Sequence, residues 1–275
     1  MSDLFAQKWP FIISVANQKG GVGKTTTAIN LAAGLVESGA RVLLIDLDPQ
    51  GNASTGLGVS PSERKRTTYD LLLDDTPVVE TILETKISGL YISPANADLS
   101  SADMELVANE KRSFLLHDSL RSPDIDPFRF DFILIDCPPS LSLLTVNALV
   151  ASHSVLVPLQ TEFFALEGLS QLMLTLRDIR KNANPELRIE GIVLTMHDAR
   201  NKLSQQVEAD ARKTLGDLVF RTVIPRNVRV GEAPSFALPV LNYDSQSKGA
   251  EAYRALTAEV LKRHPLSRRR EVSEK

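Results

Sequence analysis

A glycine-rich turn between an apolar run and an amphipathic segment constrains the fold of this chain more than any other feature. The apolar run 11–16 is followed by Lys-Gly-Gly-Val-Gly-Lys-Thr-Thr at positions 19–26, and apolar residues then recur at helical spacing over 25–38. Glycines let backbone N–H groups turn inward around phosphate oxygens, and a helix N-terminus adds free donors with partial positive charge. The order strand, turn, Lys-Thr and helix therefore predicts a phosphate-binding loop.

The residue types within this loop predict individual roles. Lys24 would reach the β- and γ-phosphates of a nucleotide, and Thr25 would place its hydroxyl on Mg²⁺. The usual spacing G-x-x-x-x-G-K-T requires glycine at position 18, but the chain has Gln18 there and a second lysine, Lys19, five residues before Lys24. The predicted ATP-binding residues of the loop are Lys19, Gly20, Gly21, Val22, Gly23, Lys24, Thr25 and Thr26.

Carboxylates follow two other apolar runs. Asp46 and Asp48 come at the end of the run 42–45, and Asp136 ends the run 130–135. Ligands of open parallel sheets bind outside the carboxyl ends of the strands. We therefore expect the ends of these two strands to meet the phosphate-binding loop at a single site.

Apolar runs alternate with helical patterns along the chain, which predicts an α/β fold: one mostly parallel twisted sheet with helices on both faces. The segment 60–88 is polar and rich in turns, so we expect it to lie outside the core. The predicted organisation is an N-terminal extension at 1–10, one ATPase domain at 11–264 and a basic, flexible tail at 265–275. The strands are predicted near 11–16, 42–45, 90–93, 130–135, 154–159, 189–194 and 219–224, and the helices near 25–38, 98–110, 141–150, 165–182, 202–215 and 247–263.

The cysteine content, the apolar stretches and the charge distribution limit the kinds of protein that this chain can be. The 275 residues include one cysteine, Cys137, so an intramolecular disulfide is impossible and a cytoplasmic protein is expected. No stretch approaches the roughly 18 apolar residues of a membrane span. The net charge is −3, but residues 196–275 hold 15 Lys and Arg against 10 Asp and Glu. This asymmetry predicts a basic face on an otherwise acidic protein.

The motifs together resemble the ParA/Soj partition ATPases, whose phosphate-binding loop deviates from the usual pattern and which belong to the larger group that includes MinD. The resemblance covers about residues 11–263. The segments that carry it are 15–31 (VANQKGGVGKTTTAINL), 46–52 (DLDPQGN), 136–140 (DCPPS), 195–200 (TMHDAR) and 224–235 (IPRNVRVGEAPS).

The resemblance implies a catalytic arrangement shared between two subunits. Lys19 matches the lysine that crosses a dimer interface to the partner's phosphates, which makes homodimerisation depend on ATP. Asp48 matches the residue that orients the attacking water, and Lys19, Lys24 and Asp48 form the implied catalytic set. Asp46 and Asp136 would hold the Mg²⁺ shell together with Thr25. Contacts to adenine are implied for Pro225 and Asn227.

The resemblance also implies partners. Members of the family bind double-stranded DNA without much sequence preference as ATP-bound dimers, and a ParB-type protein releases them by stimulating a weak ATPase activity. Such a protein is cytoplasmic and nucleoid-associated, and does not bind the membrane. The DNA-binding residues would be Arg200, Lys202, Arg226, Arg229 and Lys248.

Three alternatives share parts of this pattern. A MinD-like membrane switch needs a C-terminal amphipathic helix, but here Pro265 interrupts the end of the chain. An iron protein of the nitrogenase type needs two cysteines per chain, and the chain has one. A ParA-like ATPase that positions another cargo would share every motif, so this alternative stays open.

Overall fold

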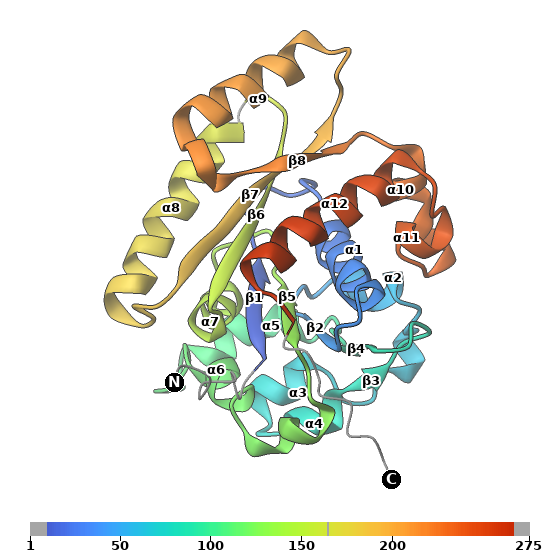
Figure 1. Ribbon diagram of the computed structural model, residues 1–275. Coiled ribbons are helices and arrows are strands. Elements are labelled where there is room, and N and C mark those ends of the chain that lie inside the picture. The colour runs from blue at the N-terminus through green and yellow to red at the C-terminus, as the bar shows by residue number, and fades with distance from the viewer. Residues whose placement is uncertain (1–9, 164, 267–275) are drawn as a thin grey trace, which may run out of the picture.

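The computed structural model describes residues 10–163 and 165–266, and they form one eight-stranded sheet with helices on both faces (Figure 1). The strand order is β3-β4-β2-β5-β1-β6-β7-β8, and all pairs are parallel except the antiparallel pair β3–β4. The predicted fold class is therefore confirmed. The parts of the predicted extension and tail at 1–9 and 267–275 lie outside the described residues.

The strands are β1 Phe11–Val15, β2 Val42–Asp46, β3 Leu83–Glu84, β4 Leu90–Ser93, β5 Phe132–Asp136, β6 Ser154–Gln160, β7 Arg188–His197 and β8 Val219–Pro225. The helices are α1 Lys24–Glu37, α2 Asn52–Gly56, α3 Thr68–Leu73, α4 Val78–Thr81, α5 Leu99–Leu106, α6 Leu115–Ser119, α7 Leu143–Ala151, α8 Ala165–Asn182, α9 Lys202–Leu215, α10 Val228–Glu232, α11 Val240–Tyr243 and α12 Lys248–Arg263. Short 3₁₀ helices span Pro61–Glu63, Pro123–Phe128, Gly216–Leu218 and Ala233–Phe236.

The apolar runs are nearly continuous because each central strand faces a hydrophobic core on both sides. In β1, Ile12 packs into the core beneath α5–α9, and Ile13 packs into the opposite core beneath α1, α11 and α12. Leu43 and Leu44 of β2 divide in the same way. Successive side chains of a strand point to opposite faces, so a strand buried on both faces has few polar positions.

The prediction that 60–88 lies outside the core is wrong. Thr67 is the N-cap of α3 and forms a capping box with Asp70, in which each side chain accepts from the other residue's N–H. The Thr67 side chain also accepts from the Tyr69 N–H. Leu71 and Leu72 of α3 are both only 3% exposed, and they pack into the core on the α5–α9 side. The apolar run Leu71–Leu73 is too short to show helical periodicity, and no helix was predicted in this segment.

A half-buried histidine, His153, lies at the other end of the sheet, away from the phosphate-binding loop. The Ile12 N–H donates to His153 Nδ1 at 3.0 Å, and the Phe11 ring stacks on His153 with centroids 5.0 Å apart. Burial, with smaller contributions from Arg121 and His264, lowers the pKa of His153 to about 4. The neutral imidazole is therefore the form that the fold accommodates.

We expect the substitution His153→Asn to reduce the amount by which the free energy of unfolding falls at acid pH. The pKa of His153 is about 4 in the fold and about 6.5 in the unfolded chain. The unfolded chain thus binds more protons between these values, and stability falls as the pH drops from about 6.5 to 4. The free energy of unfolding of the wild type should fall by about 2 kcal/mol more than that of the variant across this window, after a discount for the partial exposure of His153.

Urea unfolding of both proteins at pH 7 and pH 4.5 measures this difference. Asparagine keeps an acceptor near the position of Nδ1, so the variant should fold. Identical pH profiles for wild type and His153→Asn would show that His153 does not cause the acid sensitivity.

Candidate nucleotide-binding site

The loop between β1 and α1 has the geometry that the sequence predicts for phosphate binding. Gly21 and Gly23 have φ values of 73° and 86°, in the left-handed region that side chains disfavour, and Gly23 is the N-cap of α1. Asn17 ties the loop to β6, since its Nδ2 donates to the Pro158 carbonyl at 2.7 Å. The Thr195 hydroxyl donates to the Val22 carbonyl at 2.9 Å, which ties the loop to β7. The glycines and these two ties together hold the loop open at the N-terminus of α1.

Lys24 is buried inside this loop. Its side chain folds back, Nζ donates to the Lys19 carbonyl at 3.0 Å, and the residue is only 6% exposed. Desolvation lowers the pKa of Lys24, and the nearby Asp136, Cys137 and Asp48 partly offset that effect. A buried ammonium group without a full set of partners is costly, so a phosphate oxygen beside it would be strongly stabilised.

Asp136 ends β5 in register with both neighbouring strands, opposite Val15 of β1 and Asp46 of β2. It is fully buried, and neither of its carboxylate oxygens has a hydrogen-bond partner within the described residues. Burial first and the charge of Asp46 second raise the pKa of Asp136 well above its usual range. The Thr25 hydroxyl lies close enough to favour the charged form, although its geometry falls short of a hydrogen bond.

Asp46 has the opposite character, because its oxygens are already used. Oδ2 accepts from the Ser54 N–H at 2.9 Å and from the Ser54 hydroxyl at 2.7 Å, and Oδ1 accepts from the Asp48 N–H at 3.2 Å. Burial raises the pKa of Asp46 to about 6, although the bonds from Ser54 counteract this shift. Asp46 thus anchors the loop that follows β2 and the helix α2.

The two predicted metal carboxylates therefore differ in their fit to a cation. Thr25 and the unpartnered oxygens of Asp136 fit the water shell of Mg²⁺, whereas the oxygens of Asp46 are engaged. Within residues 10–163 and 165–266, no three His, Cys, Asp or Glu side chains form a metal cage. Mg²⁺ usually binds through one or two protein groups, substrate phosphates and waters, so a cage is not required.

Asp48 lies in the turn between β2 and α2 and is 6% exposed. Its Oδ1 accepts from the Gln50 N–H at 3.0 Å, and its carbonyl accepts from the Gly51 N–H at 2.8 Å. Gly51, with φ 61°, then begins α2. The turn fixes the Asp48 side chain near the charge of Lys24, at the same edge of the sheet as Asp136.

Lys19 has a partner that the sequence did not reveal. Its Nζ donates to Glu162 Oε2 at 2.8 Å, just beyond the end of β6, and both side chains are partly exposed at 38% and 46%. A pair this open to water contributes no more than about 1 kcal/mol. Lys19 is thus held by its own chain through a contact that is easily exchanged.

Pro225 and Asn227 border a cavity of about 190 Å³ beside the phosphate-binding loop. Gly23 and Thr26 form the loop side of the cavity, and the Asn227 side chain also caps α10 by accepting from the Arg229 N–H. Six further lining residues were not predicted as site residues: Thr195, Met196, Ile224, Val230, Gly231 and Tyr253. Arg226, predicted to bind DNA, also lines this cavity. Met196 has φ 51°, a strained value for a side-chain-bearing residue, and such values concentrate at functional sites.

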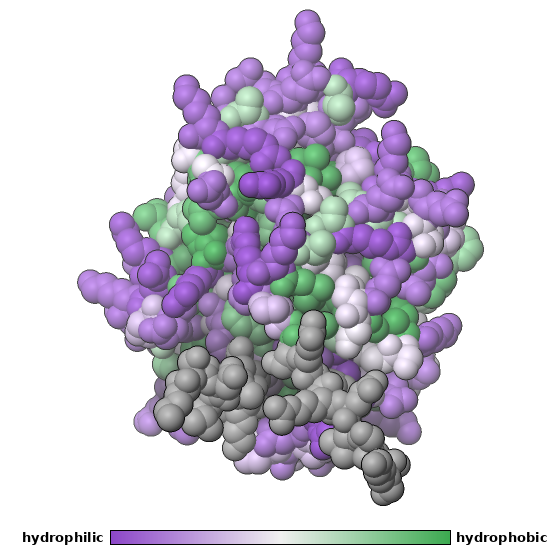
Figure 2. All heavy atoms as spheres, viewed as in Figure 1, coloured by the Kyte–Doolittle hydropathy of each residue, from purple (hydrophilic) through white to green (hydrophobic). Residues whose placement is uncertain are grey.

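The predicted DNA-binding residues lie at the carboxyl ends of β7 and β8, which are neighbours in the sheet. Arg200 and Lys202 are exposed between β7 and the first turn of α9, and Arg226 is exposed just after β8. Arg229 pairs with Glu232 at 2.9 Å and Asp244 at 3.2 Å. Lys248 begins α12 and is exposed. In the view of Figure 2, hydrophilic side chains dominate the surface over α9.

Comparison with known proteins finds relatives that match most of this chain. A family model described as an AAA domain matches residues 11–189. A chromosome partitioning protein, ParA of Caulobacter vibrioides, is 54% identical over 252 residues, covering 92% of this chain and 94% of that protein. The sporulation initiation inhibitor protein Soj of Bacillus subtilis is 50% identical, and the match covers 90% of this chain and 97% of that protein. A crystal structure described as cobyrinic acid a,c-diamide synthase from Mycobacterium smegmatis, with bound ADP and magnesium, matches this chain with a TM-score of 0.80 at 37% identity. The match covers 93% of this chain and 95% of that one.

Proposed function

The chain belongs to the ParA/Soj family of chromosome-partitioning ATPases, and from that membership we propose that it segregates DNA by an ATP-dependent switch. The ATP-bound form is a homodimer that binds DNA without sequence preference. Hydrolysis, stimulated by a ParB-type partner, returns it to a monomer that leaves the DNA. A protein that cycles on and off chromosomal DNA in this way would be cytoplasmic and associated with the nucleoid. Among the described helices, none is long and apolar enough to cross a membrane.

The observation that carries this proposal is the arrangement of charge around the phosphate-binding loop. Lys24, Asp136 and Asp48 surround the N-terminus of α1, and the Lys19 side chain lies at the rim in a partly exposed ion pair with Glu162. ATP with Mg²⁺ matches this site, because the buried ammonium group needs an anion and the Asp136 oxygens need a donor or a cation. The nucleotide and magnesium in the Mycobacterium smegmatis structure support the same ligands.

The residues of this chain divide the work of hydrolysis. Lys24 binds the β- and γ-phosphates from within the loop, and Thr25 and Asp136 hold the Mg²⁺ shell. When held there, Mg²⁺ would supply positive charge beside the phosphate oxygens. Asp48 orients the attacking water, while Asp46 fixes the Asp48 turn through its amide and through Ser54. Pro225 and Asn227 border the space for adenine.

Lys19 connects chemistry to association. It would leave Glu162 and enter the phosphate site of a second subunit, in the way that an arginine finger acts in trans. Dimerisation then doubles the basic surface formed by Arg200, Lys202 and Arg226. The dependence of DNA affinity on salt concentration grows by about 0.9 in the log–log slope for each phosphate contact. The affinity for DNA is therefore low for a monomer and higher for a dimer, which makes twice as many phosphate contacts.

Arg200→Glu should abolish ATP-dependent retention of DNA in a gel shift without changing basal hydrolysis. The Arg200 side chain is 92% exposed and, among the described residues, forms its one ion pair with Asp198 of its own turn, so its replacement should leave the nucleotide site intact. Loss of two contacts per dimer should lower the salt slope by about 2. Arg180→Glu on α8, at the opposite end of the sheet, is the charge-matched control. Undiminished retention by the Arg200 variant would place the DNA surface elsewhere.

A ParB-type protein from the same organism tests the partition role itself. We expect it to raise the ATPase rate of the DNA-bound dimer and to release the dimer from DNA, as followed by phosphate release and fluorescence anisotropy. An ATPase that dimerises on DNA but ignores ParB-type proteins would favour the alternative of another cargo.

A further inference from the structure

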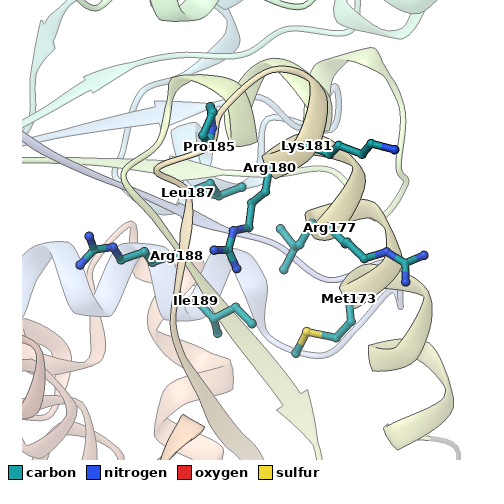
Figure 3. Close-up of a pocket in the computed structure, with 9 residues that line it drawn as sticks. Met173, Arg177, Arg180, Lys181, Pro185, Leu187, Arg188 and Ile189 are labelled. Carbon is teal, nitrogen blue, oxygen red and sulfur yellow. The ribbon is translucent and has the colours of Figure 1, made fainter.

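One cavity among the described residues is remote from the nucleotide site and has no role in the cycle above. It has a volume of about 470 Å³ and lies between the last turns of α8 and the start of β7 (Figure 3). The carboxyl ends of the strands hold the nucleotide site, and this recess is at the amino end of β7. A volume of this size falls within the range of ligand-binding pockets.

The floor of the recess is apolar. Leu176 of α8 and Leu187 just before β7 are buried at 3% and 1% exposure, and Met173 and Ile189 are partly exposed beside them. Unbranched methionine adapts its shape to different partners. The floor can therefore take a large apolar side chain, which would remove further apolar surface from water.

Four cations form the rim: Arg177, Arg180, Lys181 and Arg188. Figure 3 shows the Arg180 side chain projecting from α8 into the space in front of Ile189. Within residues 10–163 and 165–266, these cations form a single ion pair, a long one of 3.9 Å between Arg188 and Glu186. Arg180 and Lys181 also compensate the negative end of the α8 dipole, but Arg177 lies outside the last turn and Arg188 lies on the strand.

The recess is separate from the proposed DNA surface. Arg188 begins β7, and Arg200 follows three residues after its end, so a strand of ten residues lies between them. At about 3.3 Å per residue, that strand spans roughly 30 Å. The recess therefore remains accessible when the carboxyl edge of the sheet is occupied by nucleotide, DNA or a second subunit.

We propose that this recess, lined by Met173, Leu176, Arg177, Arg180 and Arg188, is a docking site for an acidic segment of a partner protein that inserts a large apolar side chain. The rim cations would pair with carboxylates on either side of that side chain. A DNA duplex is the poorer match, because its rigid charged backbone has no apolar group to place on the floor. The net charge of the chain is −3, so its surface as a whole does not attract acidic partners, and the local cations would direct an acidic segment to this recess.

Fluorescence anisotropy on the full-length protein tests the proposal. The probe is a fluorescein-labelled twelve-residue peptide of Asp and Glu with Leu-Phe at its centre, and the comparison peptide has Ser-Ser there. We expect the Leu-Phe peptide to bind at least tenfold more tightly than the Ser-Ser peptide. The double variant Arg177→Glu/Arg180→Glu should weaken Leu-Phe binding at least tenfold, and Met173→Ser should reduce the difference between the peptides.

Lys202→Glu, a single charge reversal at the other end of β7, is the control and should leave peptide binding unchanged. The ATPase activity of the double variant should equal that of wild type, which separates this test from that of the proposed function. Equal affinity for both peptides would reduce the recess to a nonspecific basic surface and overturn the proposal. So would binding of a 24-base-pair duplex that is lost in the double variant but kept in Lys202→Glu.

Discussion

Lys19→Ala should bind ATP and yet remain a monomer. Lys19 lies at the rim of the loop, whereas the buried Lys24 faces its interior, so nucleotide affinity should fall only slightly. Removing one partner of a buried charged contact between proteins costs about 2–5 kcal/mol, and each dimer would lose two such contacts. The dimer dissociation constant should rise by at least 100-fold. Light scattering with a slowly hydrolysed ATP analogue, beside an equilibrium nucleotide titration, measures both quantities.

Glu162→Gln provides the matched control for this prediction. In the isolated subunit, both substitutions break the same 2.8 Å ion pair between Lys19 and Glu162. Only Lys19→Ala removes the group that would enter the partner's phosphate site. We therefore expect Glu162→Gln to dimerise with ATP at least as well as wild type, since Lys19 no longer has to leave a carboxylate. If Lys19→Ala still dimerised with ATP, the lysine would have no role in trans.

The sequence predicted the central part of the site because local order determines it. The loop 19–26 follows β1 and begins α1, so its position requires no knowledge of distant residues. Asp46 and Asp136 end strands that are adjacent in the sheet, and the rule for parallel sheets brings such ends together. Which of the two retains free oxygens was not predictable, because it depends on where Ser54 of α2 comes to lie.

The missed residues act over long sequence separations. Glu162 is 143 residues from Lys19, and Thr195 is 173 residues from Val22. No periodicity or spacing pattern links such pairs, so only the folded chain shows them. The segment 60–88 was missed for a different reason. The residues of this segment that pack into the core lie on short helices such as α3. Thr68 of α3 also donates to the Asp46 carbonyl at 2.8 Å. Elements this short carry too few apolar residues for a pattern.

Asp48→Ala should keep ATP binding and dimerisation but lose turnover. Asp48 is not needed to bind phosphate, because Lys24 and the loop amides do that. A positioned group that assists proton transfer or orients water contributes about 10²- to 10⁴-fold, so we expect the stimulated hydrolysis rate to fall at least 100-fold. The variant should accumulate as an ATP-bound dimer that stays on DNA. Single-turnover hydrolysis and light scattering of the same sample measure both effects.

Asp48→Asn separates the chemistry of Asp48 from its structural role. Asparagine keeps an oxygen that can accept the bond that Asp48 Oδ1 now receives from the Gln50 N–H at 3.0 Å, so the turn before α2 should persist. It cannot carry the negative charge that would draw a proton from the attacking water. If the carboxylate acts on water, asparagine should be nearly as slow as alanine. If the turn alone matters, asparagine should restore most of the rate, and normal turnover in both variants would remove Asp48 from the mechanism.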